Sequence, residues 1–196
     1  MIKPWSMAYV MVLIIPLLYG CAAVVVGGVT AGVSLVHERR STGTVIDDEG
    51  VELKVRNLVD QNQDLASHSR VSATSFNGLV LLTGQTDSPE ARDRIGRLTH
   101  DLPKVRRIEN YITAEPFSGL GDDTNDAYLT TRVKTALFNV RIPDFDPTRV
   151  KVVTERAVVY LMGLVTVREA AAAVEEARYV PGVRKVVKVF EIIQDY

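Results

Sequence analysis

Cysteine, histidine and net charge are all scarce in this chain of 196 residues. A single cysteine, Cys21, excludes an intrachain disulfide and a zinc site built from cysteines. The three histidines, His37, His68 and His100, are scattered, with no pair at the spacing of metal ligands on a helix. With 23 basic and 24 acidic residues the net charge is −1, whereas proteins that coat nucleic acid carry a strongly basic surface. We therefore expect no metal, no cofactor and no nucleic-acid partner.

The signatures of common catalytic sites are also missing. The chain has no Gly-x-Ser-x-Gly nucleophile elbow and no His-Glu-x-x-His zinc motif. The glycines of residues 27–32 are not followed by Gly-Lys-Ser/Thr, so they do not form a phosphate-binding loop. We expect His68 and His100 to be exposed surface residues rather than catalytic bases. These absences predict a protein that is not an enzyme.

What the chain does have is the composition of a globular protein. Hydrophobic residues make up 46% and charged residues 24%, which excludes a disordered tail. The first 20 residues differ from the rest: Lys3 is their only charge, and the apolar run Met7–Leu18 is interrupted by Pro16. This run is shorter than the ~20 residues that a membrane-spanning helix needs, and it is typical of a secretory signal. We therefore assign residues 1–20 to a signal peptide.

The segment Leu18-Tyr19-Gly20-Cys21 follows this run directly and resembles the lipobox of bacterial lipoproteins. In a lipobox, a small residue precedes the cleavage site and the cysteine thiol receives the lipid. The resemblance implies a diacylglyceryl group and an N-linked acyl chain such as palmitate at Cys21. Two or more acyl chains hold a protein stably on a membrane, whereas one binds marginally. The alternative is an uncleaved anchor helix that continues through residues 22–36, with Cys21 buried.

The residues after Cys21 indicate which membrane the lipoprotein is sent to and whether the segment is flexible. Ala22 stands where inner-membrane lipoproteins carry a retaining aspartate, so the lipobox resemblance implies the outer membrane. Residues 21–44 are rich in glycine and have little periodicity, and we expect them to form a flexible tether.

The remainder of the chain contains the same pattern twice. Gly84 and Gly163 end matching apolar runs, at a spacing of 163 − 84 = 79, and Ala91 and Ala170 repeat that spacing, 170 − 91 = 79. Two copies are too few for a solenoid. We therefore expect two small tandem domains, at residues 45–116 and 125–196, joined by a linker at 117–124.

Each copy shows the periodicity of a helix, a hairpin, a second helix and a final strand. In the first copy the predicted elements are 48–62, 71–74, 79–83, 90–100 and 107–113, with the hairpin turning at Asn77-Gly78. In the second copy they are 125–140, 150–154, 158–162, 168–179 and 185–193, with Asn125 or Asp126 as the helix N-cap. The order predicts an α+β fold, α-β-β-α-β in each copy, with two helices on one face of a three-stranded mixed sheet. Because a unit of ~70 residues buries little core, we expect the copies to pack together or against partners.

This order, with its Gly-x-x-x-x-x-Glu-Ala element, resembles the BON domain. The stretches Asn125–Lys134 and Leu161–Ala170 are close to the pattern of outer-membrane lipoproteins that carry two BON domains. The resemblance covers the chain from Cys21 to its C-terminus. It implies a periplasm-facing lipoprotein that binds anionic phospholipid, such as phosphatidylglycerol or cardiolipin. It also implies a role in outer-membrane integrity and cell division.

The two first helices differ on their outward faces. Successive helical residues turn ~100°, which places Leu129, Val133, Ala136 and Val140 of the second copy on a core face. The predicted lipid-binding residues lie on or beside the opposite face: Tyr128, Thr131, Arg132, Lys134, Thr135 and Phe138. In the first copy that face has Lys54, Asn57 and Gln61, with Leu53 as its only apolar residue. Aromatic rings beside cations are typical of a surface that meets anionic lipid. In the resembled family the lipid-contacting helix corresponds to this one, with tryptophan in place of Tyr128.

Other interpretations of these residues stay open. Tyr128 and Phe138 could pack between the two copies, and Arg132 and Lys134 could be ordinary solvated charges. The loop 141–145 could extend the membrane face or close the domain. A rival function is a periplasmic module that binds a protein of the envelope, such as a member of an outer-membrane assembly complex.

Overall fold

A computed structural model describes residues 38–115, 117 and 120–194 of the chain. The predicted signal peptide, the predicted lipidation site Cys21 and residues 22–37 of the predicted tether lie outside the described residues. His37–Tyr196 forms one compact unit. It contains all three hydrophobic clusters described below, so a fragment of residues 37–196 holds the packing it needs to fold.

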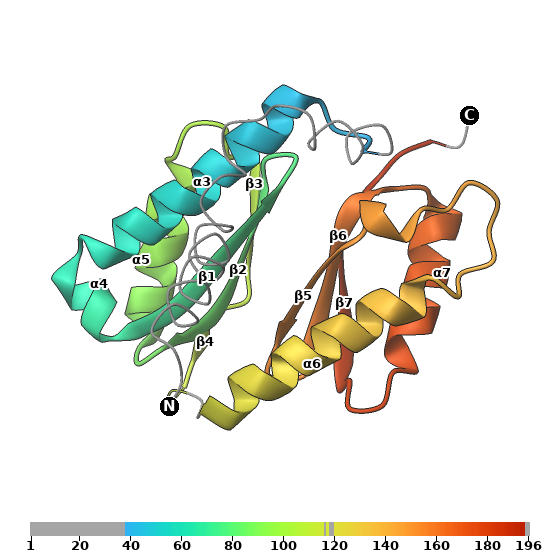
Figure 1. Cartoon of the computed structure of the whole chain (residues 1–196). Helices are drawn as coiled ribbons and strands as arrows, with labels where there is room; N and C mark the ends of the chain where they lie inside the picture. The colour runs from blue at the N-terminus through green and yellow to red at the C-terminus, as the bar shows by residue number, and fades with distance from the viewer. Residues whose placement is uncertain (1–37, 116, 118–119, 195–196) are drawn as a thin grey trace, which may run out of the picture. The chain divides into compact units, whose positions relative to one another are not determined.

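The first repeat consists of two main helices and a mixed sheet. In chain order its elements are α3 (Thr42–Asp60), α4 (Gln63–Ser67), β1 (Ser69–Phe76), β2 (Leu79–Thr86), α5 (Pro89–His100), β3 (Arg107–Asn110) and β4 (Thr113–Ala114). Strand β2 is central: β1 pairs with it antiparallel, and both β3 and β4 pair with it parallel. The helices cover one face of this sheet (Figure 1).

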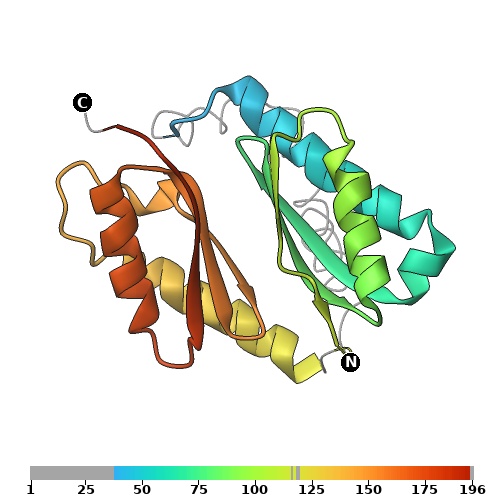
Figure 2. The same cartoon turned by 180° about the vertical axis from the view of Figure 1, so that it is seen from behind.

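The second repeat has the same order. Its elements are α6 (Leu120–Leu137), the 3₁₀ turn η1 (Pro147–Arg149), β5 (Lys151–Glu155), β6 (Val158–Val165), α7 (Val167–Arg178) and β7 (Lys185–Ile192). Strand β6 is central, with β5 antiparallel and β7 parallel to it. Helices α6 and α7 lie on one face of the sheet, as the view from behind also shows (Figure 2). The predicted α+β fold, with a mixed sheet and two covering helices in each copy, is confirmed.

Both first helices begin earlier than the sequence predicted. Helix α3 begins at Thr42 because the Ser41 hydroxyl accepts a hydrogen bond from the Thr44 N–H and caps it. Residues 42–44 are therefore helical rather than part of a flexible tether. Helix α6 begins at Leu120, so residues 120–124 of the predicted linker are helical and neither Asn125 nor Asp126 is an N-cap. The sequence also missed α4 and β4, which are only five and two residues long.

Each repeat has its own core between its helices and its sheet. Helix α3 contributes the buried residues Val51, Val55 and Val59, and helix α6 contributes Leu129, Val133 and Leu137. Two further residues were predicted on the core face of α6. Ala136 packs against the core of the second repeat, whereas Val140 is half-buried and lies beyond the end of the helix. Sterics require glycine at the repeated strand position. A Cβ on Gly84, whose φ is +114°, would lie 2.0 Å from the Arg70 carbonyl oxygen.

A third cluster draws on both repeats. Its buried members are Phe76, Leu79 and Leu81 from the first repeat and Tyr160, Met162, Val187 and Val189 from the second. The rings of Tyr111 and Tyr160 lie with centroids 5.0 Å apart. Burial, with Glu155 and Tyr111 nearby, raises the pKa of Tyr160 to about 12, so its hydroxyl stays neutral in this cluster. The two small cores are thus joined by apolar packing, as their size led us to expect.

Candidate lipid-binding surface

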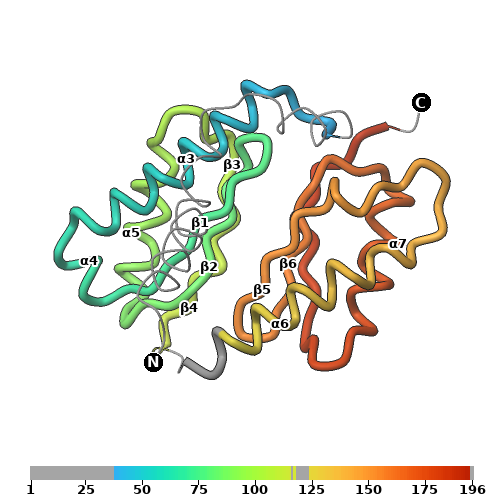
Figure 3. The backbone as a smooth tube through the Cα atoms, viewed as in Figure 1, coloured from blue at the N-terminus to red at the C-terminus, as the bar shows by residue number. Residues whose placement is uncertain are grey.

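Two exposed aromatic side chains lie on helix α6 and directly after it: Tyr128 is within the helix, and Phe138 follows its last residue, Leu137. Tyr128 is 57% exposed and Phe138 is 66% exposed. Neither belongs to the cluster that joins the repeats. The interpretation that these rings pack between the copies does not match the structure. The tube in Figure 3 shows α6 as one continuous helix running past β5 and β6.

Three polar side chains between the two rings, Thr131, Arg132 and Thr135, are already hydrogen-bonded. The Thr131 hydroxyl donates to the Ala127 carbonyl oxygen at 3.1 Å, and the Thr135 hydroxyl donates to the Thr131 carbonyl oxygen at 3.0 Å. Arg132 donates to the Tyr128 hydroxyl at 3.1 Å, with its guanidinium carbon 5.6 Å from the ring centroid. Because hydroxyls bonded to their own helix present mainly their methyl groups outward, Thr131 and Thr135 cost little to dehydrate.

The surface is cationic. Arg132, Lys134 and Arg141 are exposed, and among the described residues neither Lys134 nor Arg141 has a hydrogen-bond or ion-pair partner for its side chain. Between residues 124 and 143 the only acidic residue is Asp126, which is buried. Its carboxylate accepts hydrogen bonds from the backbone N–H groups of the β5–β6 turn. No carboxylate in this segment therefore neutralises the three cations.

The loop after α6, residues 141–145, packs partly against the core of the second repeat. Phe145 packs against the core of the second repeat, so its ring closes the domain rather than extending the exposed surface. Pro143 is exposed and Ile142 is half-buried. The loop therefore contributes little apolar surface beside Phe138.

The first repeat lacks the aromatic pair but is not purely polar on its outward side. Leu53 is 55% exposed, as the sequence indicated, and Ile46 is 63% exposed. The sequence missed Ile46 because it placed the start of the helix at Asp48. The statement that Leu53 is the only apolar residue on this face is thus wrong. The difference between the repeats is aromatic and cationic character rather than the presence of apolar side chains.

Two arginines that precede α3 bind carboxylates of both repeats, and no sequence pattern predicted these contacts. Arg39 makes a bidentate ion pair with Glu169, at 2.7 and 2.9 Å, and also donates to the Leu164 carbonyl oxygen at 2.7 Å. Arg40 binds the Asp48 carboxylate at 2.8 Å, with its guanidinium 3.8 Å from the Phe76 ring centroid. Residues 39 and 40 are therefore held in place rather than free.

Glu169 and Asp48 are the two carboxylates at the centre of these contacts. Burial raises the pKa of Glu169, but the hydrogen bonds from Arg39 and the Thr166 N–H outweigh it, and the pKa lies below its ordinary value. Glu169 also completes a capping box with Thr166 at the start of α7.

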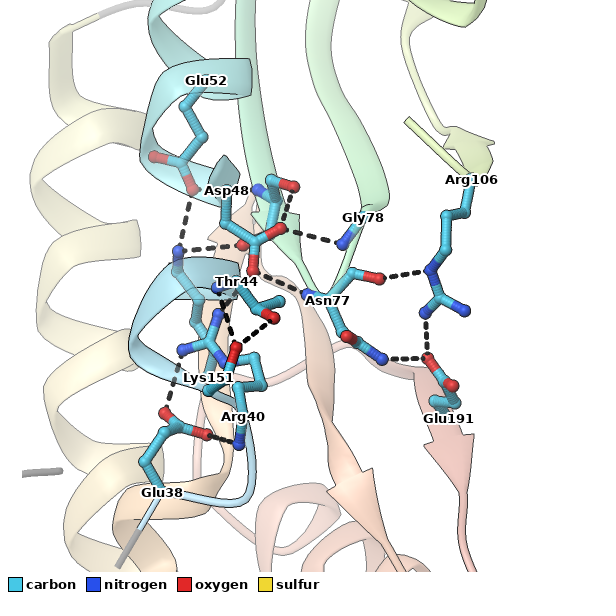
Figure 4. A network of polar contacts seen from close by, with 12 residues as sticks. Glu38, Arg40, Thr44, Asp48, Glu52, Asn77, Gly78, Arg106, Lys151 and Glu191 are labelled. Carbon is cyan, nitrogen blue, oxygen red and sulfur yellow. Dashed lines mark hydrogen bonds and ion pairs between the residues drawn. The ribbon is translucent and has the colours of Figure 1, made fainter. Parts of the chain in front are cut away.

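Asp48 organises the β1–β2 turn (Figure 4). It accepts hydrogen bonds from the Ser75 hydroxyl at 2.6 Å and from the N–H groups of Asn77 and Gly78 at 2.7 and 2.8 Å. Burial acts to raise the pKa of Asp48, but these bonds and the one from Arg40 lower it below its ordinary value. Beside this turn, Glu191 of β7 accepts from Asn77 at 2.9 Å, which links the two repeats (Figure 4).

We searched the described residues for a cavity with reactive side chains and for a metal site. A cavity of about 620 Å³ is lined by Arg39, the loop at 142–144 and the start of α7, and its one glutamate, Glu169, is occupied by Arg39. No group of three histidine, cysteine or acidic residues within the described residues could hold a metal ion. His68 and His100 are exposed. Among the helices described, none combines the length and apolar character needed to span a bilayer.

Comparison with known proteins identifies the repeats. The model of the BON domain matches residues 47–116 and 125–194. This chain belongs to the BON family. The two BON repeats together cover most of it, in agreement with the resemblance drawn from the sequence.

Two characterised relatives match over most of their length. The chain is 37% identical over 177 residues, 90% of each chain, to the outer membrane lipoprotein DolP of Haemophilus influenzae. It is 35% identical over 155 residues, 79% of each chain, to a 21 kDa hemolysin of Actinobacillus pleuropneumoniae. Neither name is that of an enzyme. The similarity to DolP confirms the prediction of a lipid-anchored protein of the outer membrane.

A more distant likeness involves a solved structure. The C-terminal domain of CdsD, a structural protein of the type III secretion system of Chlamydia trachomatis, matches 75% of this chain and 67% of that chain. With 15% identity and a TM-score of 0.29, it carries no argument about fold or function.

Proposed function

We propose that this BON protein is a non-enzymatic lipoprotein, acylated at Cys21 and facing the periplasm, which binds anionic phospholipid through helix α6. Phosphatidylglycerol and cardiolipin are the proposed ligands, and the proposed cellular role is to support outer-membrane integrity, including at division sites. The observation that carries the proposal is the exposed pair Tyr128 and Phe138, with the hydroxyls of Thr131 and Thr135 hydrogen-bonded to the helix between them. Among the described residues, the nearby cations Lys134 and Arg141 have no carboxylate partner.

The spacing of the rings suits a helix that lies flat on a membrane. Leu137, the last residue of α6, lies 137 − 128 = 9 residues after Tyr128, which is about 14 Å along a helix at ~1.5 Å per residue, and Phe138 follows it directly. With α6 parallel to the bilayer, both rings reach the headgroup region together, as in other interfacial amphipathic helices. Arg132 and Lys134 lie between them in sequence and would meet lipid phosphates.

The expected affinity of this surface alone is modest. Burying a Phe-sized side chain is worth ~1.5–3 kcal/mol, and each cation near an anionic surface adds ~1 kcal/mol. A total of ~4 kcal/mol corresponds to about millimolar affinity. A lipid anchor supplies an effective concentration of the same order, so the site would be substantially occupied once Cys21 is acylated.

The contacts of Arg39 are compatible with this geometry. Arg39 lies 39 − 21 = 18 residues after Cys21, a length of chain that spans at most about 60 Å at ~3.3 Å per residue. Since Arg39 is bound to Glu169 in the second BON repeat, the chain from the anchor joins the same repeat that carries α6. The anchor and α6 can therefore engage one leaflet.

Vesicle co-sedimentation of residues 37–196 tests this proposal. We expect the fragment to sediment with vesicles that contain phosphatidylglycerol or cardiolipin and to remain in the supernatant with neutral lipid. The double variant Tyr128→Ala/Phe138→Ala should lose at least tenfold in binding. The matched control is Ile46→Ala/Leu53→Ala, which removes two exposed apolar side chains from α3. Equal binding by wild type and the Tyr128→Ala/Phe138→Ala variant would contradict the proposal.

A second candidate function is a docking module for a protein of the envelope, including the outer-membrane assembly machinery. The observation that favours it is the exposed Ile46 and Leu53 on α3, which the lipid proposal leaves unused. A protein partner that is captured from lipid-free extracts by wild type and is lost with Ile46→Ala/Leu53→Ala would support it.

A further inference from the structure

The turn that connects α7 to β7 repeats the side-chain arrangement seen on α6. We define residues 178–188 as the α7–β7 tip. Its Tyr179 is 67% exposed, and Arg178 donates to the Tyr179 hydroxyl at 2.8 Å with its guanidinium carbon 4.7 Å from the ring centroid. On α6, Arg132 pairs with Tyr128 in the same manner. The second BON repeat therefore displays two exposed tyrosine–arginine pairs.

The tip lies against α6. A Cβ placed on Gly182 would be 3.0 Å from the Cδ2 atom of Leu129, so the turn packs directly on the residue that follows Tyr128. On the other flank of α6, the Thr130 hydroxyl donates to the Thr154 hydroxyl of β5 at 2.8 Å. Because helical residues turn ~100° each, Arg132 lies on the flank away from Thr130, which is the flank toward α7. The tip thus continues the outward surface of α6.

The tip is strongly cationic. Between residues 178 and 190 the sequence has four basic residues and no acidic one. Arg178 pairs with Glu175 of α7 at 3.3 Å. Among the described residues, the side chains of the other three make no hydrogen bond or ion pair, and all three are exposed: Arg184, Lys185 and Lys188.

The equivalent turn of the first BON repeat is neutralised. Pro103 and Pro181 align at a spacing of 181 − 103 = 78, which places Asp101 at the position of Tyr179. The three cations of the first turn all have carboxylate partners: Lys104 with Asp47 at 3.1 Å, Arg106 with Glu191 at 2.6 Å and Arg107 with Glu109 at 2.9 Å. A free cationic tip with an exposed aromatic ring is therefore specific to the repeat that carries the aromatic α6 surface.

We infer that the α7–β7 tip is a second contact with the anionic bilayer, beside α6. The inference rests on the proposed function and extends it. In this arrangement the Tyr179 ring lies at the headgroup level while Arg184 and Lys185, where the turn meets β7, contact lipid phosphates. A single helix in contact with the membrane allows the repeat to rotate about the helix axis. A second contact beside it fixes that rotation.

Binding of residues 37–196 to vesicles of phosphatidylglycerol and phosphatidylethanolamine tests the tip. Each cation near an anionic surface contributes about fivefold in affinity, so Lys185→Glu should weaken binding at least fivefold. Tyr179→Ala should weaken it by a similar factor. The control is Arg107→Glu, at the position of the first repeat that matches Lys185, with an expected change of less than twofold. A thermal unfolding curve for each variant checks that it is folded.

The possible outcomes separate the tip from the α6 surface. If Phe138→Ala weakens binding but Tyr179→Ala and Lys185→Glu bind as wild type does, the tip inference is wrong and the proposed function stands. If Lys185→Glu and Arg107→Glu weaken binding equally, the effect is one of overall charge and the inference is again wrong. If wild type does not bind the anionic vesicles at all, the proposed function fails and the tip inference fails with it.

Discussion

The Asp126 carboxylate accepts a hydrogen bond from the backbone N–H of Ala157 at 2.8 Å, across 31 positions of sequence. Asp48 makes the equivalent bond to Gly78 in the first BON repeat, also at 2.8 Å. In both repeats an aspartate of the first helix thus holds the hairpin turn between the first two strands. Helix α6, which carries the proposed lipid-binding surface, is positioned on its sheet by this contact as well as by its core residues.

Ala157→Gly is expected to stabilise the protein. Arg156 and Ala157 have φ values of 50° and 61°, a left-handed conformation that alanine adopts at a cost and glycine adopts freely. We expect the free energy of unfolding to rise by about 0.5–1 kcal/mol, measured by chemical denaturation. Gly78→Ala is the converse variant: its Cβ would lie 2.8 Å from the Lys104 carbonyl oxygen, so it should destabilise by more than that amount. A lower stability of Ala157→Gly would contradict this account.

These two turns show what the sequence could and could not reveal. Asn77-Gly78 is a strong local signal because both residues tolerate positive φ, and the predicted hairpin is confirmed. The second hairpin was found only by its alignment with the first, since Arg156 and Ala157 carry no such preference. Its turn depends on Asp126, and a contact over 30 residues leaves no local pattern.

The candidate surface was accessible to sequence reasoning only in part. Helical periodicity placed Tyr128 and Phe138 outward because the buried positions of α6 are regular. The sequence also shows that residues 178–190 contain no acidic residue, but the contact of the α7–β7 turn with α6 depends on how Gly182 packs on Leu129. The ion pair between Arg39 and Glu169 joins residues 130 positions apart, so no spacing rule could predict it.

Acid should weaken the fold through Asp48. The pKa of Asp48 is lower in the folded protein than its ordinary value of 3.8, because hydrogen bonds to its charged form outweigh burial. Its contribution to stability is therefore complete above the unfolded pKa and is lost as the pH falls through the lower, folded pKa. We expect the free energy of unfolding to decrease from about pH 4 downward.

Asp48→Asn isolates this effect. The variant should be less stable at pH 7 by about 2 kcal/mol, because hydrogen bonds to a charged group are lost, and its stability should depend less on pH below about 4. The control, Asp60→Asn, removes an exposed carboxyl from the same helix. The measurement is urea denaturation between pH 7 and pH 2.5. Parallel curves for wild type and Asp48→Asn would show that Asp48 does not carry the acid sensitivity.

Arg39→Ala is expected to loosen the start of α7. The Glu169 side chain is only 6% exposed, and the variant leaves its carboxylate with the N–H group of Thr166 but removes the guanidinium that is hydrogen-bonded to it. We expect a loss of about 1–3 kcal/mol in the free energy of unfolding. Hydrogen exchange should show faster exchange in the first turn of α7. Arg168→Ala, at an exposed neighbouring position, is the control and should change stability by less than about 0.5 kcal/mol. Unchanged exchange in Arg39→Ala would contradict a structural role for the pair.

The central claim is that the outward face of α6 enters an anionic bilayer, and tryptophan quenching tests it most directly. The only tryptophan of the chain is Trp5, so a fragment of residues 37–196 has none and a single one can be introduced. With vesicles of phosphatidylglycerol that carry brominated acyl chains, we predict that the emission of Tyr128→Trp shifts to the blue and is quenched. Leu53→Trp, on the outward face of α3, should remain unquenched in the same vesicles. If Tyr128→Trp keeps the emission it has in buffer while the fragment sediments with the vesicles, α6 is not the membrane contact.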